Sequence, residues 1–244
     1  VKIAAIQPHS LQGEVKVKKT LFAALAAAAV LAMPAAHADE TSVVKAIQAC
    51  NADFFKAVAA DKNIPESLKV RDGDMAYLKI EKVPLDVVLF EKPFKEDGLT
   101  VTGYIFNDEV IRYLGTPDMH THFWGLLVKE DWKSVVDKIK IDWEAVDTNH
   151  KSAHGNRMQR SNHDKDWKPY QREQNYTMPE LGKIERVFHV APYEDKTMIF
   201  CSMQSAGAPS ETILKETRPD LLFGEKEVPV RQEAIQSSNP HAGM

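Results

Sequence analysis

The sequence predicts an α+β protein in which an N-terminal helix packs on a mainly antiparallel β-sheet with hairpins, held by one disulfide. Three observations support this fold class. Residues 41–60 repeat apolar side chains at helical spacing, two later segments read as β-hairpins, and the only two cysteines lie far apart in apolar segments. Alternating apolar positions joined by short turns are typical of antiparallel strands.

An export signal precedes this expected domain. Three lysines at positions 16, 18 and 19 are followed by a 13-residue apolar run (21–33) and by Ala36-His37-Ala38. A positive flank, a short apolar core and a small-residue exit are the three parts of a secretory signal peptide. We expect residues 1–38 to be an upstream extension plus this signal, cleaved near Ala38-Asp39. The mature protein is then periplasmic or secreted.

The negative net charge of the mature chain argues against some classes of binding partner. Removal of residues 1–38 takes away four lysines and one glutamate, which changes the net charge from −4 to −7. An acidic protein is repelled by nucleic acid and by anionic lipid, so neither is expected as the main partner. No apolar stretch after the signal reaches 18 residues, so we predict no transmembrane segment in the mature chain.

The mature part is expected to form one domain over residues 39–203. Within it, residues 147–182 are rich in polar and charged side chains, and they predict a long polar loop. Residues 204–244 are rich in Pro, Ser and Glu, which predicts a C-terminal tail that is partly disordered.

The helix and the disulfide are predicted together. Val43, Ile47, Cys50, Phe54 and Val58 recur at spacings of three and four, which places them on one face of a helix. Cys50 therefore faces the core, where a strand that bears Cys201 can meet it. In an oxidising compartment such a pair is expected to be bridged. The alternative, a redox or catalytic thiol, lacks a CxxC motif.

Two hairpins and a central strand form the predicted sheet. Residues 87–90 and 99–106 flank an Asp97-Gly98 turn and predict a hairpin. Residues 185–190 and 197–201 predict a second hairpin. The apolar run 122–128 predicts a central strand, and Asp131 after it is expected to cap a short helix over 132–139.

Histidines supply the candidate metal ligands. His120 and His122 share one face of a strand, and His150 and His154 would share a face if that piece were helical. Histidine is a common zinc ligand, so these four suggest a site for zinc or another divalent transition metal. The other interpretation is that the imidazoles are simply solvated in polar loops, because no HExxH motif or Cys/His knuckle is present.

Motifs of catalysis are otherwise missing from the sequence. There is no GxSxG, no Gly-rich phosphate loop and no SxxK, and nothing in the sequence pattern sets a base beside Ser202 or Ser205. We therefore expect no catalytic residues and no cofactor. The first hypothesis is an exported accessory, inhibitor or immunity-type factor that binds another envelope protein through Trp167 and Tyr170 in the polar loop. The alternative is a histidine-based metal-binding protein or metal-dependent hydrolase.

Overall fold

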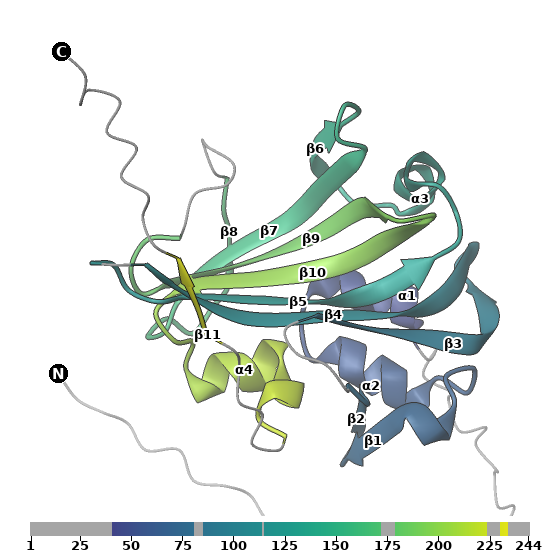
Figure 1. Ribbon diagram of the computed structural model, residues 1–244, viewed down its shortest axis with the longest axis horizontal. Coiled ribbons are helices and arrows are strands. Elements are labelled where there is room, and N and C mark those ends of the chain that lie inside the picture. Colours follow the sequence, from purple (N-terminus) through teal and green to yellow (C-terminus); the bar gives the residue numbers. More distant parts are fainter. Residues whose placement is uncertain (1–40, 81–84, 114, 172–178, 224–229, 234–244) are drawn as a thin grey trace, which may run out of the picture. The chain divides into compact units, whose positions relative to one another are not determined.

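The computed structural model describes residues 41–80, 85–113, 115–171, 179–223 and 230–233. Its strands are mostly antiparallel and its helices few (Figure 1), and a disulfide joins Cys50 to Cys201. The mixed class, the antiparallel sheet and the disulfide predicted from the sequence are confirmed. The predicted signal peptide lies outside the described residues.

The main sheet runs in the order β11-β4-β5-β10-β9-β7-β6, with β3 beside β4 and β8 beside β7. Neighbouring strands are antiparallel, apart from β11, which is parallel to β4. The strands are β3 (Leu85–Glu96), β4 (Leu99–Tyr113), β5 (Met119–Val128), β6 (Trp143–Asp147), β7 (Ser152–Ser161), β8 (Lys168–Pro169), β9 (Lys183–Tyr193), β10 (Lys196–Ala206) and β11 (Val230–Glu233).

Both predicted hairpins are present. Strands β3 and β4 are joined by Asp97-Gly98, whose φ angles of 48° and 77° are both positive. Two consecutive positive φ angles match the twist of the flanking strands, which is why an Asp-Gly pair is favoured there. Strands β9 and β10 form the second hairpin, and β5 lies between β4 and β10 as the predicted central strand.

The two faces of the sheet differ in character, and β10 shows the difference most clearly. Ile199, Cys201 and Met203 are fully buried in the hydrophobic core. Because side chains alternate along a strand, Phe200, Ser202 and Gln204 point to the opposite face. We call these the core face and the pocket face of the sheet.

The predicted helix over 41–60 is two helical pieces. Helix α1 (Val43–Ala46) runs into the short helix η1 (Ile47–Ala49), and α2 (Asp53–Ala60) follows. Between them Cys50 adopts a left-handed conformation with φ of 50°, which ends the first piece because regular helix needs negative φ. The expectation of one continuous helix was wrong, although Cys50 does face the core.

Smaller elements complete the N-terminal and middle parts. Helix η2 (Glu66–Leu68) precedes a separate two-stranded sheet of β1 (Lys69–Asp72) and β2 (Met75–Leu78). Helix α3 (Trp132–Lys138) begins as predicted, since the Asp131 carboxylate accepts hydrogen bonds from the backbone of Lys133 and Ser134. No helix in the described part of the chain is both long and apolar enough to cross a membrane.

The prediction of a long polar loop over 147–182 was wrong. Strand β7 occupies residues 152–161 and forms ladders with β6 and β9. Its polar side chains are compensated by ion pairs, including Arg157 with Glu185 and Arg160 with Glu216. Residues 152–161 are therefore structural, and polar composition alone gave the wrong expectation for them. Residues 172–178 of the predicted loop lie outside the described residues.

The predicted boundary at residue 203 was also wrong. Strand β10 continues to Ala206, and helices α4 (Glu211–Thr217) and η3 (Pro219–Leu221) follow. Ile213 is fully buried, and so is Arg218, whose guanidinium lies 4.9 Å from the ring centroids of Phe106 and Trp124. Residues 224–229 and 234–244 of the predicted tail lie outside the described residues.

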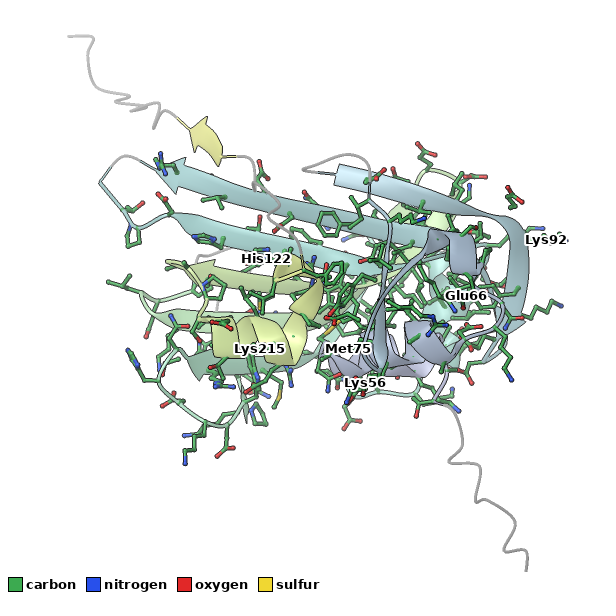
Figure 2. The ribbon with its side chains drawn as sticks, turned by 90° about the horizontal axis from the view of Figure 1, so that it is seen from below. Lys56, Glu66, Met75, Lys92, His122 and Lys215 are labelled. Carbon is green, nitrogen blue, oxygen red and sulfur yellow. A yellow bond between two sulfur atoms is a disulfide. The ribbon has the colours of Figure 1, made fainter. Side chains whose placement is uncertain are left out.

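The helices present a polar side as well as buried residues. Lys56 of α2 and Lys215 of α4 keep half or more of their side chains exposed (Figure 2). On the buried side of α2, the ring of Phe54 stacks on Tyr104 of β4 with centroids 6.2 Å apart. This division is the amphipathic pattern of helices at the surface of a core.

We predict that the Cys50–Cys201 bridge is a major source of stability. The two residues are 151 positions apart, and the chain-entropy model gives about 5 kcal/mol for closing a loop of this length. The double variant Cys50→Ala/Cys201→Ala should lose most of that free energy of unfolding in urea. Reduced wild type is the matched control and should behave alike. A loss below about 1 kcal/mol in both would contradict the prediction.

Candidate functional site

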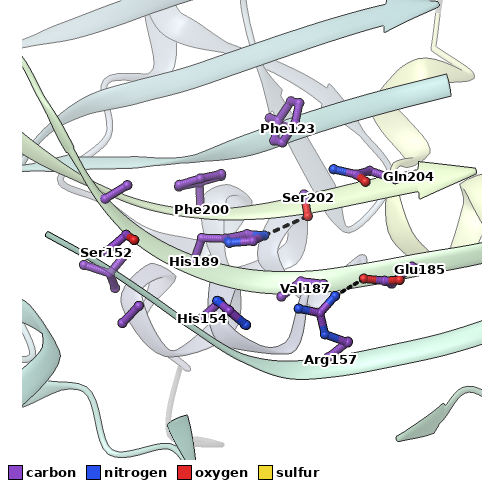
Figure 3. Close-up of a pocket in the computed structure, with 13 residues that line it drawn as sticks. Phe123, Ser152, His154, Arg157, Glu185, Val187, His189, Phe200, Ser202 and Gln204 are labelled. Carbon is purple, nitrogen blue, oxygen red and sulfur yellow. Dashed lines mark hydrogen bonds and ion pairs between the residues drawn. The ribbon is translucent and has the colours of Figure 1, made fainter. Parts of the chain in front are cut away.

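A pocket of about 400 Å³ lies on the pocket face of the sheet (Figure 3). Its walls come from four strands that are consecutive neighbours in the sheet, in the order β5-β10-β9-β7. The volume falls within the range of small-molecule sites in proteins. Because the wall residues stand on paired strands, their positions are fixed by the sheet.

One end of the pocket is aromatic. Phe200 stacks on His189 with ring centroids 4.9 Å apart and planes inclined by 17°, and Phe123 lies 6.0 Å from Phe200. Gly125 is the cross-strand neighbour of Phe200, and a Cβ there would lie 2.5 Å from the Cβ of Phe200. A side chain at position 125 would therefore displace this aromatic wall.

The middle of the pocket holds a serine and a histidine in contact. The Nε2 atom of His189 lies 2.8 Å from the Oγ atom of Ser202. No motif in the sequence predicts a base beside Ser202, but the predicted hairpin of β9 and β10 implies that His189 lies near it. Its register sets His189 opposite Phe200, one diagonal step from Ser202 on the same face, and diagonal neighbours are within reach of long side chains.

Both histidines of the pocket favour the neutral form. Burial, together with the nearby His154 and Arg157, lowers the pKa of His189 to about 3. Burial and Arg157 also lower the pKa of His154, against the opposite effect of Glu144. At neutral pH neither imidazole adds positive charge to the pocket.

The other end of the pocket is charged. Arg157 donates from Nε to Glu144, at 2.9 Å, and from Nη1 to Glu185. A bulge between Gly155 and Met158 adds one residue to β7, where Asn156 has a φ of 53°. This extra residue turns Arg157 to the pocket face, because without it the side chain would point to the core. Two carboxylates thus surround one guanidinium.

The four candidate metal ligands occupy three separate places. His120 and His122 lie on β5 with ring centroids 6.3 Å apart, and His122 is buried on the core face in contact with Asp108. His150 is exposed in a turn, where its Nδ1 lies 2.7 Å from Asp147. Only His154 belongs to the pocket. The condition that residues 150–154 be helical is not met, since β7 begins at Ser152.

Within the described ranges, no group of three or more His, Cys, Asp or Glu side chains is arranged to hold a metal ion. The pairs that do form join a histidine to one carboxylate. The hypothesis of a zinc or other divalent-metal site therefore stays a prediction.

The two candidate partner-binding aromatics lie outside the pocket. Trp167 is partly buried, and the guanidinium of Arg186 lies 4.3 Å from its ring centroid. The backbone N–H of Tyr170 donates to the carbonyl of Arg157 at 3.2 Å. Arg186 therefore covers one side of the Trp167 ring, which leaves less of that ring for a partner.

The contact between Ser202 and His189 raises the question of nucleophilic catalysis. A serine nucleophile needs a base and also donors for the oxyanion. The backbone around Ser202 is committed to ladders with both β5 and β9. In the part of the chain that the structure describes, this backbone offers no oxyanion hole beside Ser202.

Compared with protein-family models, curated proteins and solved structures, the chain gives no match. The functional argument therefore rests on the residues of the pocket.

We predict that His189 makes the folded state sensitive to acid. Its pKa is lowered on folding, so the unfolded chain takes up a proton below about pH 6.5 while the folded chain does not. The contribution of this group to the free energy of unfolding is thus fully present above that pH. It falls as the pH drops toward 4, by at most about 1.4 kcal/mol per pH unit.

Urea unfolding of wild type and His189→Gln at pH 7, 6, 5 and 4 checks this prediction. The variant should lose less stability with acid. His163→Gln, at an exposed position, is the control and should follow wild type. Equal acid dependence in all three proteins would contradict the prediction.

Proposed function

We propose that this chain is an exported, non-catalytic binding protein that holds a small organic ligand in the pocket between β5, β7, β9 and β10. One observation supports this most strongly. The pocket combines a volume of about 400 Å³ with aromatic walls and a few convergent polar groups. That combination is characteristic of ligand sites.

The arrangement of the two faces supports the proposal. We propose that the N-terminal helices pack on the core face, in agreement with the contact of Phe54 with Tyr104 and the bridge from Cys50 to Cys201. In that arrangement the pocket face is the side open to a ligand. Strands paired on both sides form the walls, so little conformational entropy would be lost when a ligand binds.

The compartment is part of the same proposal. The signal-like sequence before Asp39 supports export to the periplasm or beyond. A structural disulfide between residues 151 positions apart is in keeping with an oxidising environment. An envelope protein partner bound through Trp167 and Tyr170 has less support, since Arg186 lies against the Trp167 ring.

Two measurements test the proposal. Protein purified from the periplasm should begin at Asp39 by intact mass, whereas retention of residues 1–38 would contradict export. A fragment screen by protein-observed NMR should then shift amides of β7, β9 and β10.

The variant Ala191→Phe makes the screen specific for the pocket. Ala191 lines the pocket and is partly exposed, so the strand should accept a ring that fills the cavity. We expect it to abolish the fragment shifts. Leu181→Phe, at a residue that is 72% exposed, should leave them unchanged. Fragments that bind elsewhere, or bind Ala191→Phe equally well, would contradict the proposed site.

A further inference from the structure

The side-chain amide of Gln204 is a polar group that the pocket offers to a ligand. Gln204 lines the pocket and is only partly buried (Figure 3). Within the described ranges, no hydrogen bond uses this side chain as donor or acceptor. Other polar groups of the wall are engaged, Ser202 with His189 and Arg157 with two carboxylates. The oxygen and the NH₂ group of the Gln204 amide are therefore both open to a ligand.

The register of β5 and β10 places an aromatic ring beside this amide. Phe123 is the cross-strand neighbour of Ser202, and Gln204 lies two residues further along β10, on the same face. Diagonal neighbours of this kind are about 7–8 Å apart at the backbone. Phe123 is also partly buried and lines the pocket. One small ligand can therefore touch the Phe123 ring and the Gln204 amide together.

A primary carboxamide is the group that matches the Gln204 amide best. Each amide has an acceptor oxygen and two N–H donors, so two amides in one plane can exchange two hydrogen bonds. The terminal torsion of a glutamine side chain is broad, which lets its amide turn into that plane. An ester in the same place could only accept, and the glutamine oxygen would be left without a donor.

We propose that the pocket selects ligands in which a primary carboxamide is joined to an aromatic ring directly or through one carbon. The ring lies against Phe123, since aromatic rings attract one another in offset and edge-to-face arrangements. The carboxamide exchanges two hydrogen bonds with Gln204. Val187, opposite Ser202 in the wall, adds apolar surface beside the ring. This inference rests on the proposed function and adds the chemical class of the ligand.

Three matched probes test the selectivity by protein-observed NMR titration of the mature chain at pH 7. They are 2-phenylacetamide, methyl phenylacetate and 2-cyclohexylacetamide. We expect 2-phenylacetamide to bind at least about fivefold more tightly than the ester, which has no N–H donor for the Gln204 oxygen. The cyclohexyl amide should bind about threefold or more weakly than 2-phenylacetamide, because its ring is not aromatic.

Two variants locate the groups responsible. Gln204→Met keeps an unbranched side chain but removes the amide, so the affinities for 2-phenylacetamide and its ester should come within about twofold of each other. Phe123→Leu should remove the advantage of the aromatic ring over the cyclohexyl ring and leave the preference for the amide. It reports on the site if Gln204→Met fails to fold. Gln171→Met, at an exposed residue outside the pocket wall, is the matched control and should bind as wild type does.

The outcomes separate this inference from the proposed function. If the ester binds the pocket as tightly as 2-phenylacetamide, the inference is wrong and the binding site stands. If the amide is preferred but neither Gln204→Met nor Phe123→Leu changes the order of the three probes, the inference is also wrong. If no probe binds, the ligand class is overturned, and the fragment screen decides independently whether the pocket binds small molecules at all.

Discussion

Strand β10 is fixed between β5 and β9 along nearly its whole length, and both faces of the sheet depend on that pairing. Its odd-numbered residues enter the core, where Cys201 meets Cys50. Of its even-numbered residues, Phe200, Ser202 and Gln204 line the pocket, where Ser202 meets His189. A shift of register by one residue would exchange the two sets. The disulfide is not compatible with such a shift, because Cys201 would then point away from Cys50.

The two faces of the sheet also differ in how their charged side chains are paired. On the core face, Arg218 is fully buried between two aromatic rings and pairs with Asp220 at 2.8 Å. Asp108 is buried against His122, and this contact lowers its pKa in opposition to the effect of burial. On the pocket face, the single guanidinium of Arg157 contacts two carboxylates, those of Glu144 and Glu185.

Local signals were sufficient to predict several elements of the fold. The Asp97-Gly98 turn, the Asp131 cap and the spacing that puts Cys50 on an apolar face each depend on a few neighbouring residues. Strand β7 could not be found in this way, because its polar residues find their ladders and ion pairs in β6, β9 and α4. The sequence pattern also failed to predict the break in the helix at Cys50, because the apolar spacing continues across a single left-handed residue.

Only part of the pocket could be predicted from the sequence. The predicted hairpin implies that His189 and Ser202 share a face, and the structure places them in contact. The position of Arg157 depends on a bulge in β7, and no turn or periodicity signal marked that bulge. Helix α4 was missed because so few of its residues are apolar, although Ile213 is fully buried.

The reactivity of cysteines introduced along β10 tests most directly the claim that one side of this strand faces the core and the other faces the pocket. In the oxidised protein, Phe200→Cys and Gln204→Cys should react in the native state with a small water-soluble thiol reagent, since both positions line the pocket. Ile199→Cys and Met203→Cys should react only at the rate of global unfolding, because both positions are fully buried. Reaction at all four positions alike, or faster reaction at 199 and 203, would contradict the division into a core face and a pocket face.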